Sequence, residues 1–169
     1  MFHMGQSTDA ILFYGYCWTE ETSKPWTIGK DDGDDGDEGW EDRWARVKGL
    51  THPAERYPEL RDRKTWKDRE PTVAEAEVIE KYRAYWAAKK ALTDAAGCVV
   101  DTHCSNECPM PLVAVKASTT RAWRGSPPQE ISGIAVDPAW PTMLDEFCTT
   151  MGIPVEGRKV GWWLVSDWS

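Results

Sequence analysis

A long helical pattern between Thr72 and Gly97 is the feature that most constrains the fold. Thr72 followed by Glu75 fits a capping box, in which each side chain bonds a free backbone amide of the other at a helix start. Pro71 just before it is compatible with a helix start. Apolar residues then follow one face at helical spacing: Val78, Tyr82, Tyr85, Ala88, Leu92 and Ala95. Gly97 is the expected stop, because glycine readily adopts the left-handed conformation that ends helices.

A second, shorter helix is predicted after Asp137-Pro138, with Gly152 as its C-terminal cap. Its apolar positions recur at i, i+3, i+4 and i+7: Trp140, Met143, Leu144, Phe147, Cys148 and Met151. Phe147 lies centrally on this face and is expected in the core. Asp145 lies on the opposite face, so its replacement by alanine is expected to be close to neutral.

Apolar runs predict strands at 10–17, 98–103, 112–117, 119–123 and 160–168. Strands and helices do not alternate strictly along the chain. This order favours an α+β fold, with a mostly antiparallel sheet of four to five strands and two helices packed on one face. The 169 residues are long enough to bury a core without disulfides, and we expect a single domain over 1–169. Residues 18–71 form a largely irregular insertion in this prediction.

The insertion contains a dense acidic run. Its carboxylates are Asp31, Asp32, Asp34, Asp35, Asp37 and Glu38, with glycines between them, and the whole chain has a net charge of −8. A solvated, solubilising loop is one interpretation of such a run. An EF-hand calcium loop matches poorly, because Gly33 falls at loop position 3, where a ligand side chain is needed. A third interpretation is imitation of nucleic-acid phosphates, since an acidic surface is attracted to the same basic grooves.

Tryptophan is unusually frequent, with eleven in the chain. Trp86, Trp140 and either Trp162 or Trp163 are expected in the core. Five others fall in the polar insertion: Trp18, Trp26, Trp40, Trp44 and Trp66. These rings either anchor a partner, with Trp40 and Trp44 exposed beside the acidic run, or clamp the insertion onto the protein's own surface.

The segment from Gly97 to Trp123 concentrates ligand-type and nucleophile-type residues. Cys98, His103, Cys104 and Cys108 could supply zinc ligands, but the spacing contains no CxxC pair. His103, Cys104 and Cys108 around one turn are the remaining metal candidates, and no metal or other cofactor is expected. A thiol nucleophile would need contact between Cys104 and His103, with Asp101 orienting the imidazole, and neighbours on a strand face opposite ways. No catalytic residue is therefore assigned.

Composition argues against several classes of protein. No apolar run approaches the length of a membrane span, and the N-terminus lacks the basic start and apolar core of a signal peptide. No basic stripe suggests direct nucleic-acid binding. The five cysteines are expected to be reduced thiols in a cytoplasmic setting.

Several short segments occur here in a characteristic order: STDAILFYGYCW, HCS followed by PM and LVAV, RGSP, and GWWLVSDW. Together they resemble a group of short uncharacterised proteins encoded by tailed bacteriophages and prophages. The resemblance covers most of the expected compact fold and omits the acidic insertion. It implies an accessory protein that acts in the host cytoplasm, and it supplies no catalytic residue.

These observations lead to one main hypothesis and two alternatives. The main hypothesis is a non-enzymatic protein that binds a host protein or complex and inhibits a nucleic-acid enzyme or a defence complex, as an anti-CRISPR factor does. The first alternative is a small metal-dependent or thiol enzyme domain built on Asp101, His103, Cys104 and Cys108. The second is a structural or assembly accessory protein that works by self-association, so a homo-oligomer is an open possibility.

Overall fold

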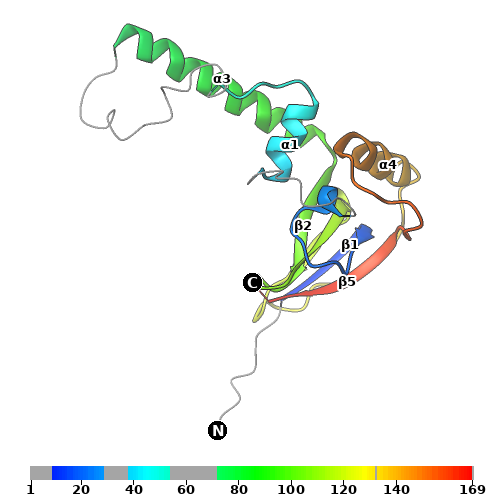
Figure 1. The fold of residues 1–169 in the computed structure, drawn as a ribbon. Helices are drawn as coiled ribbons and strands as arrows, with labels where there is room; N and C mark the ends of the chain where they lie inside the picture. Colours follow the sequence, from blue (N-terminus) through cyan, green and yellow to red (C-terminus); the bar gives the residue numbers. More distant parts are fainter. Residues whose placement is uncertain (1–8, 29–37, 54–71, 132, 169) are drawn as a thin grey trace. The chain divides into compact units, whose positions relative to one another are not determined.

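The computed structural model describes residues 9–28, 38–53, 72–131 and 133–168 (Figure 1). The chain is an α+β protein whose five-stranded sheet is mostly antiparallel. The chain divides into two compact units, residues 1–37 together with 96–169, and residues 38–95. We call the first the sheet unit and the second the helical unit. No helix in the described ranges has the length and apolar character needed to cross a membrane.

The sheet unit contains strands close to those that the sequence predicts. They are β1 (Asp9–Cys17), β2 (Cys98–Cys104), β3 (Pro109–Val115), β4 (Thr120–Ala122) and β5 (Gly161–Asp167). β1 is central: it pairs with β5 along one edge, and with β3 and β4 along the other. β2 pairs with β3 and meets β5 at a single parallel bridge between Cys104 and Asp167. β1, β5, β2 and β3 therefore close into a ring with an inner and an outer face.

The inner face of the ring holds a small apolar core. Its buried members are Ile11, Phe13, Leu112 and Ala114. At Gly15 the backbones of β1 and β3 leave no room for a side chain, because a Cβ atom built on it would lie 1.9 Å from the carbonyl oxygen of Val113. Only glycine fits this crossing without moving the backbone of β3.

The outer face packs against α4 (Trp140–Met151), as Figure 1 shows. The buried residues of α4 are Leu144, Phe147, Cys148 and Met151, four of the six that its periodicity predicts. Gly152 ends the helix at φ +67°, which confirms the predicted cap. Asp145 accepts a hydrogen bond from the Tyr16 hydroxyl of β1 at 2.9 Å. The expectation that Asp145 faces away from the rest of the protein is therefore wrong.

A short 3-10 turn, η4 (Lys116–Ser118), separates β3 from β4. The chain stops pairing with β1 at this turn, so no strand carbonyl on this edge accepts a hydrogen bond from the backbone amide of Tyr14. The Ser118 hydroxyl accepts that amide's hydrogen bond at 2.9 Å and donates to the Val115 carbonyl at 2.7 Å. One buried side chain thus replaces the missing strand partner.

The helical unit contains α1 (Trp40–Val47) and α3 (Val73–Ala95). The capping box of α3 is confirmed: a Glu75 carboxylate oxygen accepts from the Thr72 amide at 2.7 Å, and the Thr72 hydroxyl accepts from the Glu75 amide at 3.4 Å. The two helices contact each other, and the Trp44 indole of α1 donates to the Leu92 carbonyl of α3 at 3.1 Å. Trp86 is 48% exposed, so its predicted place in the core is wrong.

Parts of residues 18–71 are more ordered than the expected irregular insertion. The helix α1 and the 3-10 turn η1 (Pro25–Thr27) both lie within it. Trp18 and Trp26 are fully buried, with 0% and 1% of their surface exposed. This burial supports the interpretation in which these rings clamp the chain onto the protein's own surface. Residues 29–37 and 54–71, which include Trp66 and most of the acidic run, lie outside the described residues.

Candidate functional site

The structure pairs His103 with Cys17, and not with the neighbouring Cys104. The Nε2 atom of His103 lies 3.3 Å from the Sγ atom of Cys17 and 3.0 Å from the carbonyl oxygen of Trp18. A carbonyl oxygen only accepts, so the Nε2 nitrogen carries the proton and cannot take one from the thiol. Burial raises the pKa of Cys17 to about 11. The pair therefore holds a protonated thiol, whereas a nucleophilic cysteine needs an accessible thiolate.

The other buried thiols are core residues. Cys98 and Cys148 lie between the sheet and α4, and the Cys98 thiol is 3.9 Å from the Met143 carbonyl oxygen. Burial raises the pKa of each of these two thiols to about 12. Cys98 faces α4 while His103 faces Cys17, so these two proposed zinc ligands lie on opposite faces of the sheet. Within the described ranges, no three His, Cys, Asp or Glu side chains lie together in a way that could hold a metal ion.

Asp101 has a partner other than His103. Arg121 on β4 bonds both Asp101 on β2 and Asp167 on β5, the latter at 2.9 Å. The guanidinium thus links the two strands that meet at the parallel bridge of Asp167 with Cys104. The expected role of Asp101 in orienting the imidazole is not what the structure shows, because this carboxylate serves the closure of the ring.

Cys104 and Cys108 flank the hairpin between β2 and β3. Cys104 adopts φ +78°, a left-handed conformation that is uncommon for a residue other than glycine. Cys108 is exposed, and its amide donates to the Ser105 hydroxyl at 3.1 Å. A hydrogen bond to the Glu21 carboxylate is the main cause that raises the pKa of Cys108.

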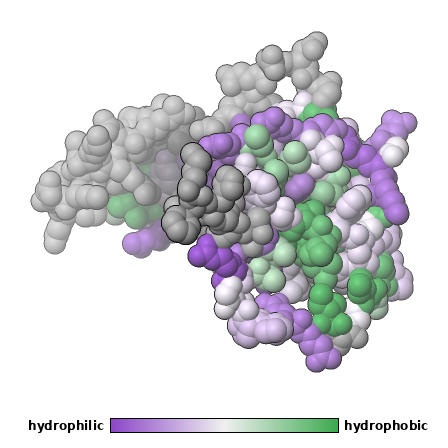
Figure 2. Space-filling view, turned by 90° about the horizontal axis from the view of Figure 1, so that it is seen from below, coloured by the Kyte–Doolittle hydropathy of each residue, from purple (hydrophilic) through white to green (hydrophobic). Residues whose placement is uncertain are grey.

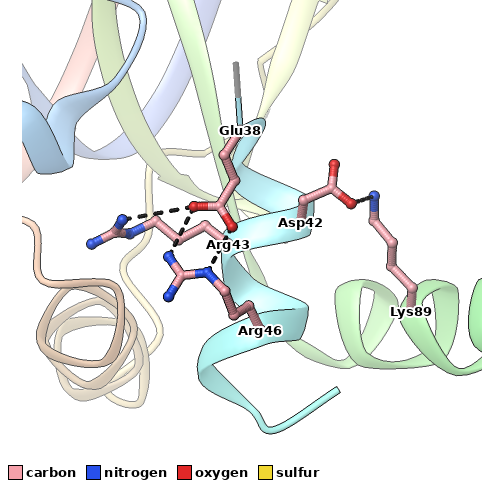
Figure 3. A network of polar contacts seen from close by, with 5 residues as sticks. All are labelled: Glu38, Asp42, Arg43, Arg46 and Lys89. Carbon is pink, nitrogen blue, oxygen red and sulfur yellow. Dashed lines mark hydrogen bonds and ion pairs between the residues drawn. The ribbon is translucent and has the colours of Figure 1, made fainter. Parts of the chain in front are cut away.

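The proposed acidic binding site is described only in part. Asp31, Asp32, Asp34, Asp35 and Asp37 lie outside the described residues. Glu38 is bonded within the helical unit. Its carboxylate accepts two hydrogen bonds from Arg46, at 2.8 and 2.9 Å, and lies 3.9 Å from the Arg43 guanidinium (Figure 3). The hydrogen bond from Arg46 lowers the pKa of Glu38. This carboxylate therefore neutralises the protein's own arginines.

The two tryptophans predicted to be exposed anchors differ in their surroundings. Trp44 is 7% exposed and its indole N–H is bonded to α3, so it is a core residue of the helical unit and the expectation of an exposed anchor is wrong for it. Trp40 is half-buried at the start of α1. On the same helix, Asp42 accepts a 2.5 Å bond from Lys89, a buried lysine of α3, as Figure 3 shows.

The connection from β4 to α4, residues 123–139, exposes apolar side chains instead. Every described residue in it is exposed. Its large apolar members are Trp123, Ile131, Ile134 and Val136, with 55%, 56%, 57% and 41% of their surfaces exposed. On the face drawn in Figure 2, hydrophobic residues form clusters on the protein surface. We call residues 123–139 the apolar connection.

Sequence reasoning missed Cys17, Arg121 and the apolar connection. Cys17 lies on β1 and Arg121 lies on β4. The arrangement of the strands in the sheet brings each of them to its partners, and this arrangement is not visible in the sequence. The apolar connection did carry a signal: prolines and glycines around isolated isoleucines, with no helical or alternating period. Such a segment has no means of burying its aliphatic side chains in regular structure.

The fold and these contacts define a small α+β protein built on a closed ring of strands. No family model, curated protein or solved structure matches the chain significantly.

Proposed function

We propose that this protein is a non-enzymatic accessory factor of a bacteriophage or prophage that binds a host protein. In this proposal the target is a nucleic-acid enzyme or a defence complex in the host cytoplasm, and binding inhibits it. The observation that carries the proposal is the exposure of Ile131, Ile134 and Val136 within one irregular segment. Isolated exposed aliphatic residues are ordinary, but several in one connection favour a protein-binding site.

Polar contacts to β1 and β4 fix the first half of the apolar connection, and a local turn ends it before α4. The Arg124 amide donates to the Asp9 carboxylate at 2.7 Å, and the Gln129 side chain donates to the Arg121 carbonyl at 3.2 Å. At the far end, the Ala139 amide donates to the Asp137 carboxylate at 2.9 Å. The first two contacts join the connection to β1 and β4, whereas the third is local to the connection. By fixing parts of the backbone, these contacts reduce the entropy that is lost when a partner binds.

The energetics favour a protein as the partner. These side chains are 41–57% exposed. Covering the exposed part of each would therefore contribute about half of the roughly 1.5–3 kcal/mol of a full burial, before the costs of association. A protein surface can cover several such side chains at once. The net charge of −8 adds long-range attraction to basic targets, which include the nucleic-acid grooves of enzymes. That attraction acts mainly on the association rate.

The test is capture of host proteins by the purified protein, followed by binding kinetics on the captured target. The double variant Ile131→Ser with Ile134→Ser should lose capture, mainly through faster dissociation. The matched control is Val73→Ser, which removes an aliphatic side chain that is 81% exposed at the start of α3. Equal capture by the wild type and the double variant would contradict the apolar connection as the binding site.

The acidic run has its own arm in this experiment. Neutralising Asp31, Asp32, Asp34, Asp35, Asp37 and Glu38 to Asn or Gln should slow association, and the effect should shrink at high salt. Screening shortens from about 10 Å at 0.1 M to about 3 Å at 1 M salt. An association rate that changes with neither charge neutralisation nor salt concentration would contradict phosphate imitation. The proposal that the apolar connection binds the partner would still stand.

A thiol enzyme is the second candidate function, because Cys17 and His103 are in contact. It requires the Cys17 thiol to react at neutral pH. Alkylation of Cys17 by iodoacetamide, followed by mass spectrometry, tests this directly. Reaction faster than that of a free thiol would favour the enzyme, and the pKa of about 11 favours slow reaction.

A further inference from the structure

The hairpin between β2 and β3 brings two cysteines of this chain together. Cys104 pairs directly with Pro109, and Cys108 is the residue before that proline. Paired residues of antiparallel strands have Cα atoms about 4.5–5.5 Å apart. A step of one residue from such a pair leaves the two Cα atoms close to the roughly 4.4–6.8 Å that a disulfide spans. We propose that Cys104 and Cys108 are a redox modification site that forms a reversible disulfide.

The local backbone supports closure of this pair. The Ser105 hydroxyl accepts from the Cys108 amide at 3.1 Å, and this bond folds the loop back on itself. Cys104 has already adopted the left-handed conformation, with φ +78°, at the position where the chain turns. Cys104 also contributes to raising the pKa of Cys108, after Glu21, which indicates that the two sulfur atoms are within electrostatic reach.

Accessibility separates this pair from the other thiols. Cys108 is exposed and Cys104 is half-buried, so a small disulfide reagent can reach the pair from solvent. Cys98 of β2 and Cys148 of α4 are buried between the sheet and α4. Cys17 is half-buried against His103, and burial raises its pKa to about 11. Among the cysteines, all of which are described, Cys108 is therefore the one placed to react first.

The chemistry balances with a low-molecular-weight disulfide such as oxidised glutathione as the oxidant. The Cys108 thiolate attacks one sulfur of the oxidant, forms a mixed disulfide and releases one glutathione thiolate. The Cys104 thiolate then attacks the Cys108 sulfur of that mixed disulfide and releases the second glutathione thiolate. The two protein thiols lose two electrons to the oxidant, and their protons pass to the two glutathione thiolates.

Closure of the ring gives the modification a structural consequence. The Cys104 carbonyl accepts the Trp168 amide at 2.6 Å, and Cys104 forms the bridge to Asp167. A disulfide at Cys104 would hold the residue at which β2 meets β5. We therefore expect oxidation to slow hydrogen exchange at the Trp168 amide and to raise the thermal midpoint.

The experiment treats the reduced 169-residue protein with oxidised glutathione and follows it by intact-mass and peptide mass spectrometry. The expected product has lost two hydrogen atoms and carries a Cys104–Cys108 bond. Cys108→Ser should abolish the reaction, and Cys104→Ser should stop at a glutathione adduct on Cys108. Cys17→Ser is the matched control and should react as the wild type does.

The pH dependence of this reaction gives an independent readout. The charged and titratable groups facing Cys108 are Glu21, Glu107 and Cys104. Glu21→Gln removes the carboxylate that most disfavours the thiolate, so it should speed oxidation at neutral pH. A stable glutathione adduct in the wild type, a disulfide that involves Cys17, or complete resistance to oxidation under conditions that oxidise an unfolded control would each overturn the proposal.

Discussion

The hydroxyl of Tyr16 donates a hydrogen bond to the carboxylate of Asp145 at 2.9 Å. This contact joins the central strand β1 to α4, the helix that covers the outer face of the ring. Burial, and then the Asp145 hydrogen bond, raise the pKa of Tyr16. The Asp145 side of α4 is thus tied to the sheet by a polar contact, although Asp145 itself is exposed.

Asp145→Ala should lower the free energy of unfolding by about 1–2 kcal/mol, because it leaves the partly buried Tyr16 hydroxyl without its acceptor. The neighbouring Glu146→Ala is the control, since Glu146 is exposed on the same helix. Chemical denaturation of both variants measures the difference. Equal midpoints would mean that water replaces the carboxylate at no cost.

Phe147→Ala should cost roughly 3–5 kcal/mol, as truncation of a buried aromatic residue does. Phe147 is 2% exposed and lies in the interface between α4 and the sheet. Thermal and urea unfolding would measure the loss. Phe147→Leu should recover much of it, because leucine fills most of the same volume, and a cost below 1 kcal/mol for the alanine variant would contradict this packing.

Gly15→Ala should destabilise the protein by more than about 3 kcal/mol or prevent folding, because the new methyl group would overlap the Val113 carbonyl. The matched control is Gly161→Ala on β5. Gly161 pairs directly with Gly15, and a Cβ atom there has no neighbour within 4 Å. Expression and circular dichroism of the two variants distinguish them, and tolerance of alanine at Gly15 would refute the close crossing of β1 and β3.

Glu38→Gln should lower stability by roughly 0.2–1 kcal/mol at neutral pH, the range of surface ion pairs. The pKa of Glu38 is lowered in the folded state, so its contribution is present above the ordinary value of 4.5 and is lost as the pH falls through the folded pKa. The wild type and the variant should therefore converge in acid. Denaturation at neutral pH and at acid pH, at low salt, measures this, and a difference that persists in acid would point to packing.

The helices α3 and α4 were readable because their signals are local. Thr72 with Glu75 caps α3, and Gly152 ends α4, through contacts within a few residues of each other. Strand positions were readable for the same reason. The helix α1 escaped prediction because Gly39, its N-cap, makes no side-chain capping bond, and because acidic and glycine residues directly precede it.

Burial of individual tryptophans depended on tertiary contacts. Trp18, Trp26 and Trp44 lie in polar stretches yet are buried, while Trp86 lies on a helix with an apolar face and is half exposed. An indole buries a large area wherever neighbouring elements supply a surface for it. That surface comes from elements distant in the sequence, so the residues next to each tryptophan do not reveal it.

The sequence by itself determined the class of fold, the cap that begins α3, the cap that ends α4, and the apolar faces that strands and helices present, since these follow from spacings of a few residues. Only the tertiary structure decided which partners meet. It placed His103 against Cys17, Arg121 between Asp101 and Asp167, and Asp145 under Tyr16. Each of these contacts joins separate elements. Those between strands depend on the register of the ring, in which every strand must satisfy its hydrogen bonds and its buried face at once.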